Sequence, residues 1–69
     1  MTEPRYRIRA VREGHPDRWL AFSERKALMM AGHPTQAYHA SRASIEALLR
    51  QRGHVFGSYS LRIEREAAD

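Results

Sequence analysis

Residues 5–10 alternate between arginine and apolar side chains, and this pattern constrains the fold more than any other feature of the chain. The segment reads Arg-Tyr-Arg-Ile-Arg-Ala. Successive side chains of a β-strand point to opposite faces, so one face carries Tyr6, Ile8 and Ala10 while the other carries arginines. The pattern therefore predicts a strand over residues 5–12 with one buried face and one charged face.

A hairpin follows this first strand. Residues 13–17 contain a glycine, a proline and an aspartate, a composition typical of a turn that returns the chain in the antiparallel direction. The next residues, 18–22, are then predicted as the second strand. Trp19 is the only tryptophan of the chain, and its large ring is expected to supply much of the core contact area in so small a domain.

The end of the chain, over residues 55–65, alternates again and is predicted as another strand. Phe56 breaks the alternation, so a bulge is expected at Gly57. When these strands form one sheet, its apolar face is the side that a helix can cover. The residues predicted on that face are Tyr6, Ile8, Trp19, Tyr59, Leu61 and Ile63.

Residues 42–52 are predicted as the main α-helix. Ser41 suits the N-terminal cap, and Gly53 suits the left-handed conformation that often follows a helix. Arg50 and Arg52 lie near the C-terminus, where the helix dipole favours cations, so these two charges have a structural interpretation. The apolar stripe of the helix consists of Ile45, Leu48 and Leu49.

The segment between the second strand and this helix is ambiguous. Ser23 suits a helix cap, and Gly32 followed by a proline suits a stop, so local rules favour a short second helix over residues 24–31. So short a helix is marginal without packing, and an irregular or extended path over 24–31 is the alternative. Weak alternation over residues 35–40 indicates a short strand.

The tripeptide Gly-His-Pro occurs twice, at residues 14–16 and 32–34. In each case a serine follows nine residues after the glycine, at Ser23 and Ser41. Two interpretations are open: a duplicated unit of turn, strand, cap and helix, or repeated use of a favourable turn composition. The second is favoured, because only four positions are identical when the two copies are aligned over eighteen residues.

These elements predict a single α+β domain over residues 1–69. It consists of an antiparallel sheet of about four strands packed on the helix of residues 42–52. A chain of 69 residues is short, and domains of this size hide only about 60% of the surface that their unfolded chains expose. The core is therefore small, and stability depends on a few well-placed apolar residues.

The sequence carries no motif of a catalytic, cofactor or metal site. It has no cysteine, which excludes disulfides and thiolate metal sites. No serine lies in a nucleophile elbow, and no glycine-rich loop could cradle a phosphate. The chain is therefore expected to act without catalysis, cofactor or metal. The four histidines lack the spacing of metal ligands and are predicted to be solvent-exposed: His15, His33, His39 and His54.

Arginine dominates the charge of the chain. There are 12 Lys and Arg residues against 8 Asp and Glu, all but Lys26 of the cations are arginine, and the net charge is +4. Side chains on one face of a strand repeat about every 6.6 to 6.8 Å, so the first strand presents a row of guanidinium groups suited to phosphates or carboxylates. The predicted partner-binding residues are Arg5, Arg7 and Arg9 of that row, Arg12 and Arg18 beside the hairpin, and Arg62 of the last strand.

This arginine row has an alternative interpretation. It could be an ordinary solvated sheet face on which Glu64 or Glu66 neutralises part of the charge. Against this, three arginines at alternate positions without an intervening acid repel one another, and a partner with negative charge would remove that cost. Arg62 extends the row if the first and last strands are neighbours.

The order of elements resembles that of small phage and prophage proteins in which a short antiparallel sheet wraps one helix. The resemblance rests on residues 5–11, which lead through Gly14-His15-Pro16 to Trp19-Leu20-Ala21, and on residues 37–49, a strand that runs into a serine-capped helix. Some anti-CRISPR proteins belong to this group. The resemblance implies an inhibitor that occupies nucleic-acid-binding surfaces of an RNA-guided surveillance complex, and it carries over no catalytic residue. The net charge of +4 departs from the acidic, DNA-mimicking members.

The leading hypothesis is therefore a non-enzymatic inhibitor, encoded by a phage or mobile element, that blocks a nucleic-acid-processing complex through its arginines. Its expected partner is a protein or ribonucleoprotein complex with an acidic surface, and DNA or RNA contact is also considered. The alternative is a small basic regulator that binds nucleic acid directly. No segment approaches the roughly eighteen apolar residues of a membrane span, so a cytoplasmic location is expected, in the host cell for a phage protein. The protein is expected to be a monomer.

Overall fold

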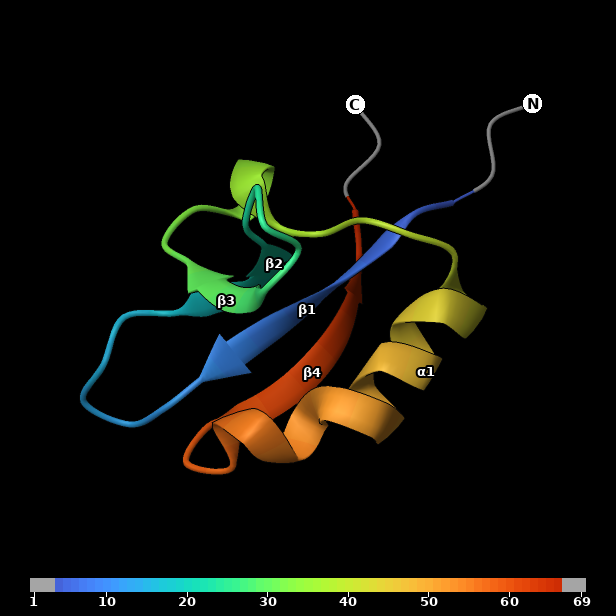
Figure 1. Ribbon diagram of the computed structural model, residues 1–69. Helices are drawn as coiled ribbons and strands as arrows, with labels where there is room; N and C mark the ends of the chain where they lie inside the picture. The colour runs from blue at the N-terminus through green and yellow to red at the C-terminus, as the bar shows by residue number, and fades with distance from the viewer. Residues whose placement is uncertain (1–3, 67–69) are drawn as a thin grey trace.

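The computed structural model describes residues 4–66, and it confirms the predicted α+β fold of a four-stranded antiparallel sheet with one main helix (Figure 1). The helix α1 spans Arg42–Arg52, and two short 3-10 helices, η1 (Pro34–Gln36) and η2 (Gly53–Phe56), precede and follow it. Among the described residues, no helix has the length and apolar character needed to cross a membrane. The strands are β1 (Tyr6–Val11), β2 (Arg18–Phe22), β3 (Leu28–Ala31) and β4 (Ser60–Arg65).

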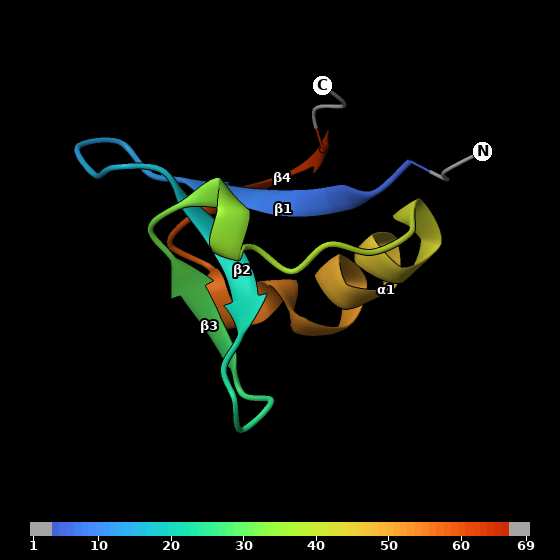
Figure 2. The ribbon, with the colours of Figure 1, turned by 90° about the horizontal axis from the view of Figure 1, so that it is seen from above.

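The sheet has the strand order β3-β2-β1-β4, so β3 and β4 are its two edges. β1 and β4 pair at six positions. β1 and β2 pair at only two, Arg9 with Trp19 and Ala10 with Arg18. Beyond these positions β2 diverges from β1, and Figure 2 shows the β2–β3 half of the sheet turned away from the β1–β4 half.

The segment between η1 and α1 fills the gap where β1 and β2 diverge. Tyr38 N donates a hydrogen bond to Leu20 O (2.9 Å). Tyr6 N donates to Ala40 O (2.8 Å), and Ala40 N donates in return to Tyr6 O (3.1 Å). The segment therefore pairs with the carbonyl of Leu20 and with the N–H and carbonyl of Tyr6, three backbone groups where the strands diverge.

The strand predicted over residues 35–40 is nevertheless wrong, because only Ala40 forms a bridge. Residues 34–36 form η1 instead, and Pro34 occupies its first turn, where a missing N–H costs nothing. His33 caps this turn, since its Nδ1 accepts a hydrogen bond from Thr35 N (3.3 Å).

The core lies between α1 and the sheet. Ile8 of β1, Leu20 of β2 and Ile45 of α1 are fully buried and form its centre, and burying one such side chain contributes about 1.5–3 kcal/mol. Ser41 caps α1 as predicted, because its Oγ accepts a hydrogen bond from Ser44 N (3.3 Å). Gly53 does not adopt the predicted left-handed conformation: its φ is −58°, and the chain continues directly into η2.

The short helix favoured over residues 24–31 is wrong, and the extended alternative holds for β3. Ser23 makes a tight turn rather than a helix cap: Lys26 N donates to Ser23 O (2.8 Å), and Ala27 N donates to Ser23 Oγ (3.2 Å). Residues 28–31 then pair with β2 along their whole length. A two-turn helix has little stability of its own, so pairing with an existing strand prevails.

The last strand is shorter than the predicted range of 55–65. Residues 53–56 form η2, and Gly57 has helical backbone angles (φ −60°, ψ −17°) in a turn, so the expected bulge is absent. Leu61 and Ile63 pack against the core as predicted, together with Phe56. Tyr59 precedes β4 and does not join this core cluster, so it does not pack in the core as predicted.

Candidate binding surface

The sheet face opposite α1 carries the arginine row. Arg7 lies opposite Glu64, and Arg9 lies opposite Arg62, in the β1–β4 ladder. Residues directly opposite each other in a ladder share a face, so Arg62 extends the row, as expected if the two strands are neighbours. The row is interrupted, because Glu64 stands between the arginines.

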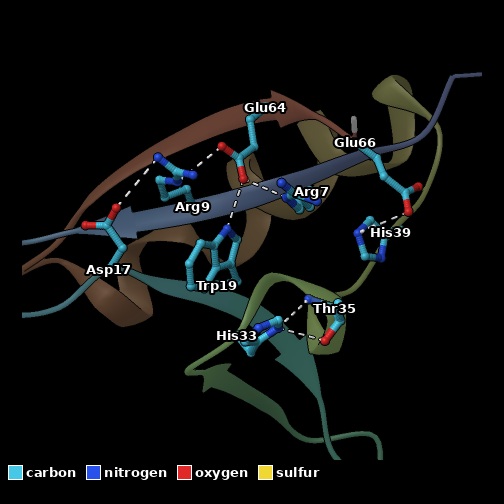
Figure 3. A network of polar contacts seen from close by, with 9 residues as sticks. All are labelled: Arg7, Arg9, Asp17, Trp19, His33, Thr35, His39, Glu64 and Glu66. Carbon is cyan, nitrogen blue, oxygen red and sulfur yellow. Dashed lines mark hydrogen bonds and ion pairs between the residues drawn. The ribbon is translucent and has the colours of Figure 1, made fainter. Parts of the chain in front are cut away.

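Glu64 holds both central arginines (Figure 3). Its Oε1 lies 2.6 Å from Arg7 Nε, and its Oε2 lies 3.2 Å from Arg9 Nε. Arg9 also reaches Asp17, with 3.6 Å between Nη1 and Oδ2. At the centre of this face, Glu64 therefore neutralises part of the arginine row, as the alternative interpretation expected. Arg7 and Arg9 have a structural role there.

The contacts of Glu64 lower the pKa of its carboxyl. Partial burial acts in the opposite direction and by itself would raise this pKa. The hydrogen bonds from Arg7 and Trp19, together with the positive charges of Arg7 and Arg9, outweigh burial, so the pKa lies below its usual range. Glu64 is therefore held as a carboxylate by its neighbours.

Trp19 lies on this arginine face and not on the predicted helix-covered face. It stands opposite Arg9 in the ladder, its Nε1 donates to Glu64 Oε1 (2.9 Å), and the Arg9 guanidinium lies 5.4 Å from the centre of its ring. Only 8% of the residue is exposed. The prediction failed because residues 18–22 place apolar side chains on both faces of the strand. The register of the hairpin decides which of these side chains face α1.

The other four predicted arginines make no ion pair with any residue in the range 4–66. Arg12 and Arg62 are exposed, and Arg18 is half-buried. Arg5 is exposed as well and donates from Nη2 to the backbone oxygen of His39 (3.2 Å). The structure therefore divides the six residues: Arg7 and Arg9 are neutralised within the fold, while Arg5, Arg12 and Arg62 remain available at the surface.

Arg12 belongs to a small cluster where the β1–β2 loop meets the start of β4. Its guanidinium lies 5.8 Å from the centre of the Tyr59 ring. The His15 ring lies beside the same tyrosine, with 6.5 Å between the ring centres. The sequence did not indicate this role for Tyr59, although its position after Gly57 and Ser58 is a signal of a turn rather than of a strand.

The opposite end of the sheet holds a second polar group. His39 Nε2 lies 3.9 Å from Glu66 Oε1, a contact that is ionic when the ring is protonated (Figure 3). His39 is partly buried, unlike the exposed histidine that was predicted. Over residues 4–66, no three His, Asp or Glu side chains come together in a way that could hold a metal ion.

Comparisons with known proteins give no relative: no protein-family model, no curated protein and no solved structure matches this chain.

Proposed function

We propose that this protein is a non-enzymatic inhibitor, encoded by a phage or mobile element, that binds and blocks a nucleic-acid-processing complex of the RNA-guided surveillance type. One observation carries the proposal. Arg12, just after β1, and Arg62 of β4 are exposed and have no ion-pair partner within residues 4–66, whereas Arg7 and Arg9 are neutralised. The choice of complex comes from the resemblance of the element order to small phage and prophage proteins, some of which are anti-CRISPR proteins.

The contact chemistry follows from the guanidinium group. Arginine presents a planar set of N–H donors that fits carboxylates and phosphates in pairs. Arg62 stands opposite Arg9 in the ladder, and like charges at such positions repel each other. A carboxylate of a partner protein, or a phosphate of its bound nucleic acid, would relieve this repulsion. An acidic partner surface is therefore the one that these residues fit.

The test is capture of a partner from a host lysate with the tagged protein, with and without nuclease. The double variant Arg12→Glu with Arg62→Glu is expected to lose the captured partner, and capture by the unaltered protein is expected to survive nuclease. The matched control is Arg50→Glu with Arg52→Glu, which changes the net charge equally at the end of α1 and should retain the partner. Equal capture by both double variants would remove Arg12 and Arg62 from the interface.

A second function, direct binding of nucleic acid by a small regulator, is favoured by the cluster of Arg12, Tyr59 and His15. An aromatic ring beside a guanidinium can stack on a base while the cation meets the phosphate. This function requires binding of a labelled single-stranded oligonucleotide that weakens steeply as salt rises, because phosphate contacts release counterions. Capture that nuclease abolishes, together with such binding, would favour this function over the inhibitor.

A further inference from the structure

β3 is an edge strand whose outer backbone groups face away from the sheet. In an antiparallel ladder, hydrogen-bonded pairs alternate with pairs that direct their N–H and C=O groups outward. Ser23 N donates to Ala27 O (2.9 Å), which marks that pair as hydrogen-bonded. Because hydrogen-bonded pairs alternate along the β2–β3 ladder, Met29 and Ala31 form hydrogen bonds with β2. The N–H and C=O groups of Leu28 and Met30 then point to the free edge of the sheet.

The neighbouring strand supports this assignment independently. Leu20 lies opposite Met30, and its carbonyl points away from β3, where it accepts a hydrogen bond from Tyr38 N (2.9 Å). If Leu20 directs its backbone away from β3, Met30 directs its own backbone away from β2. Both views show β3 as the outermost strand of its half of the sheet (Figures 1 and 2).

The two edges of the sheet differ in how they are protected. Natural proteins place charged side chains on edge strands to prevent pairing with other chains. β4 follows this rule, since it carries Arg62, Glu64 and Arg65. β3 reads Leu-Met-Met-Ala and has no charge. Apolar side chains remain exposed around it, since Met29 is 42% exposed and Phe22, opposite Leu28, is 38% exposed.

Cations flank both ends of this uncharged edge. Glu24, Arg25 and Lys26 are exposed in the turn that precedes β3, so this turn carries two cations against one acid and a net charge of +1. At the other end, the Arg18 guanidinium lies against Gly32, so close that a Cβ atom built there would be 2.9 Å from Arg18 Nη1. None of these three cations forms an ion pair with another residue of 4–66. A ligand strand along β3 would therefore meet apolar groups at its centre and positive charge at both ends.

We propose that the free edge of β3 binds an extended, acidic segment of the partner protein as a fifth strand of the sheet. The backbone groups of Leu28 and Met30 pair with the segment, and its carboxylates lie near Lys26 at one end and Arg18 at the other. Strand addition of this kind takes its affinity from main-chain hydrogen bonds and its specificity from the flanking side chains. The inference rests on the proposed function, because it specifies how an acidic protein partner would be held.

A second copy of this chain fits the same edge less well. Consider two copies of β3 paired antiparallel, with Leu28 of one opposite Met30 of the other. Lys26 then faces Gly32 of the second copy, where Arg18 lies. The pairing would bring Lys26 close to Arg18 at both ends, and like charges placed together oppose association. An acidic segment bound to one copy meets Lys26 at one end and Arg18 at the other, and both contacts are attractive.

The experiment uses purified protein and two synthetic peptides. Both have a Val-Thr-Val-Thr centre; one carries paired glutamates at each end, and the other carries paired lysines. Calorimetry is expected to detect binding of the glutamate peptide only. Hydrogen exchange is expected to slow at the amides of Leu28 and Met30 and not at those of β4. Equal binding of both peptides, or protection at β4 alone, would overturn the inference.

Two variants test the backbone and the charges separately. Met30→Pro removes an outward N–H without removing a bond to β2, and proline is tolerated on edge strands. The affinity for the glutamate peptide should fall about tenfold or more in Met30→Pro, while Met30→Ala should retain it.

Arg25→Glu with Lys26→Glu should weaken binding of the glutamate peptide and strengthen binding of the lysine peptide. This charge reversal decides the question even if Met30→Pro fails to fold. Sedimentation that shows a dimer, dissociated by Met30→Pro and retained by Met30→Ala, would assign the edge to a second copy instead.

The peptide assay separates the two proposals. If the glutamate peptide does not bind but Arg12→Glu with Arg62→Glu still abolishes capture from a lysate, the strand-addition inference fails and the proposed function stands. If the glutamate peptide binds at β3 but no acidic or ribonucleoprotein partner is captured, the edge is a peptide site and the inhibitor proposal fails.

Discussion

Glu64 is one carboxylate surrounded by two guanidinium groups and an indole N–H. Arg7 is only 16% exposed at its side chain, and Glu64 is 23% exposed, so water screens their contact less than it screens an ordinary surface ion pair. Without the carboxylate, Arg7 and Arg9 would share one partly buried space with no counter-charge except Asp17, which lies beyond Arg9. The charge balance of the arginine face thus depends on this residue.

Glu64→Gln is expected to lower the free energy of unfolding by about 1–3 kcal/mol, because it leaves two partly buried donors facing a neutral amide. Chemical denaturation followed by tryptophan fluorescence measures this change. The matched control is Glu46→Gln, which breaks the exposed pair with Arg42 on α1 (2.9 Å) and should cost no more than about 0.5 kcal/mol. Equal losses in both variants would show that Glu64 acts as an ordinary surface acid.

Sequence reasoning predicted some of these residues and missed others, for a physical reason. The parity of β1 was correct because alternation is a local property. Glu64 was named only together with Glu66, in the alternative interpretation of the arginine row, because the sequence does not show which acid lies among the arginines. The face of Trp19 could not be predicted. Its strand has apolar residues on both parities, and only the pairing of Trp19 with Arg9 decides between them.

Among the elements, α1 and β1 followed from local signals, whereas β3 did not. Ser41 caps α1, and the helix forms where its apolar stripe can cover Ile8. Ser23 offers the same hydroxyl chemistry, nine residues after the glycine of an identical Gly-His-Pro, yet it closes a turn. The difference is tertiary, because residues 28–31 gain a ladder along β2 that an isolated two-turn helix cannot match.

The turn before β3 contains a residue in an unfavourable conformation. Lys26 has a φ of 60°, in the left-handed region that glycine adopts without steric cost. Lys26→Gly is expected to leave the free energy of unfolding unchanged or to raise it by up to about 1 kcal/mol. Loss of the steric strain at this residue offsets the greater conformational freedom that glycine gives the unfolded chain. Thermal denaturation measures the change.

The neighbouring residue provides the control for this prediction. Arg25 lies in the same exposed turn but is not in the left-handed region. Arg25→Gly brings the same unfolded-state freedom without relief, so it should destabilise the protein by about 0.5–1 kcal/mol. Similar losses for Arg25→Gly and Lys26→Gly would mean that the left-handed residue is not a source of strain.

At the scale of the whole molecule, the net charge of +4 separates into parts with different roles. The centre of the arginine face is internally balanced by Glu64 and Asp17. The unbalanced cations lie toward the margins, with Arg62 on the β4 edge and Lys26 beside the β3 edge. Because these are opposite edges of the sheet, a partner that contacts both has to reach around it, and mutations at one edge should leave binding at the other measurable.

The lowered pKa of Glu64 makes the stability of the whole molecule depend on pH. The folded protein releases the Glu64 proton more readily than the unfolded chain, so the unfolded chain binds more protons between the two pKa values. The stabilisation is therefore fully present above the usual pKa of a glutamate, and it is lost as the pH falls through the lower pKa of the folded state.

This dependence can be measured as a difference between two proteins. Unfolding free energies of the unaltered protein and of Glu64→Gln are compared from neutral to acidic pH, which cancels the titration of the groups that both share. The difference is expected to be largest at neutral pH and to shrink in acid, because a protonated Glu64 and a glutamine are both neutral and neither balances Arg7 and Arg9. A difference that stays constant into the acid range would show that the carboxylate charge of Glu64 does not stabilise the fold and that only the shape of its side chain matters.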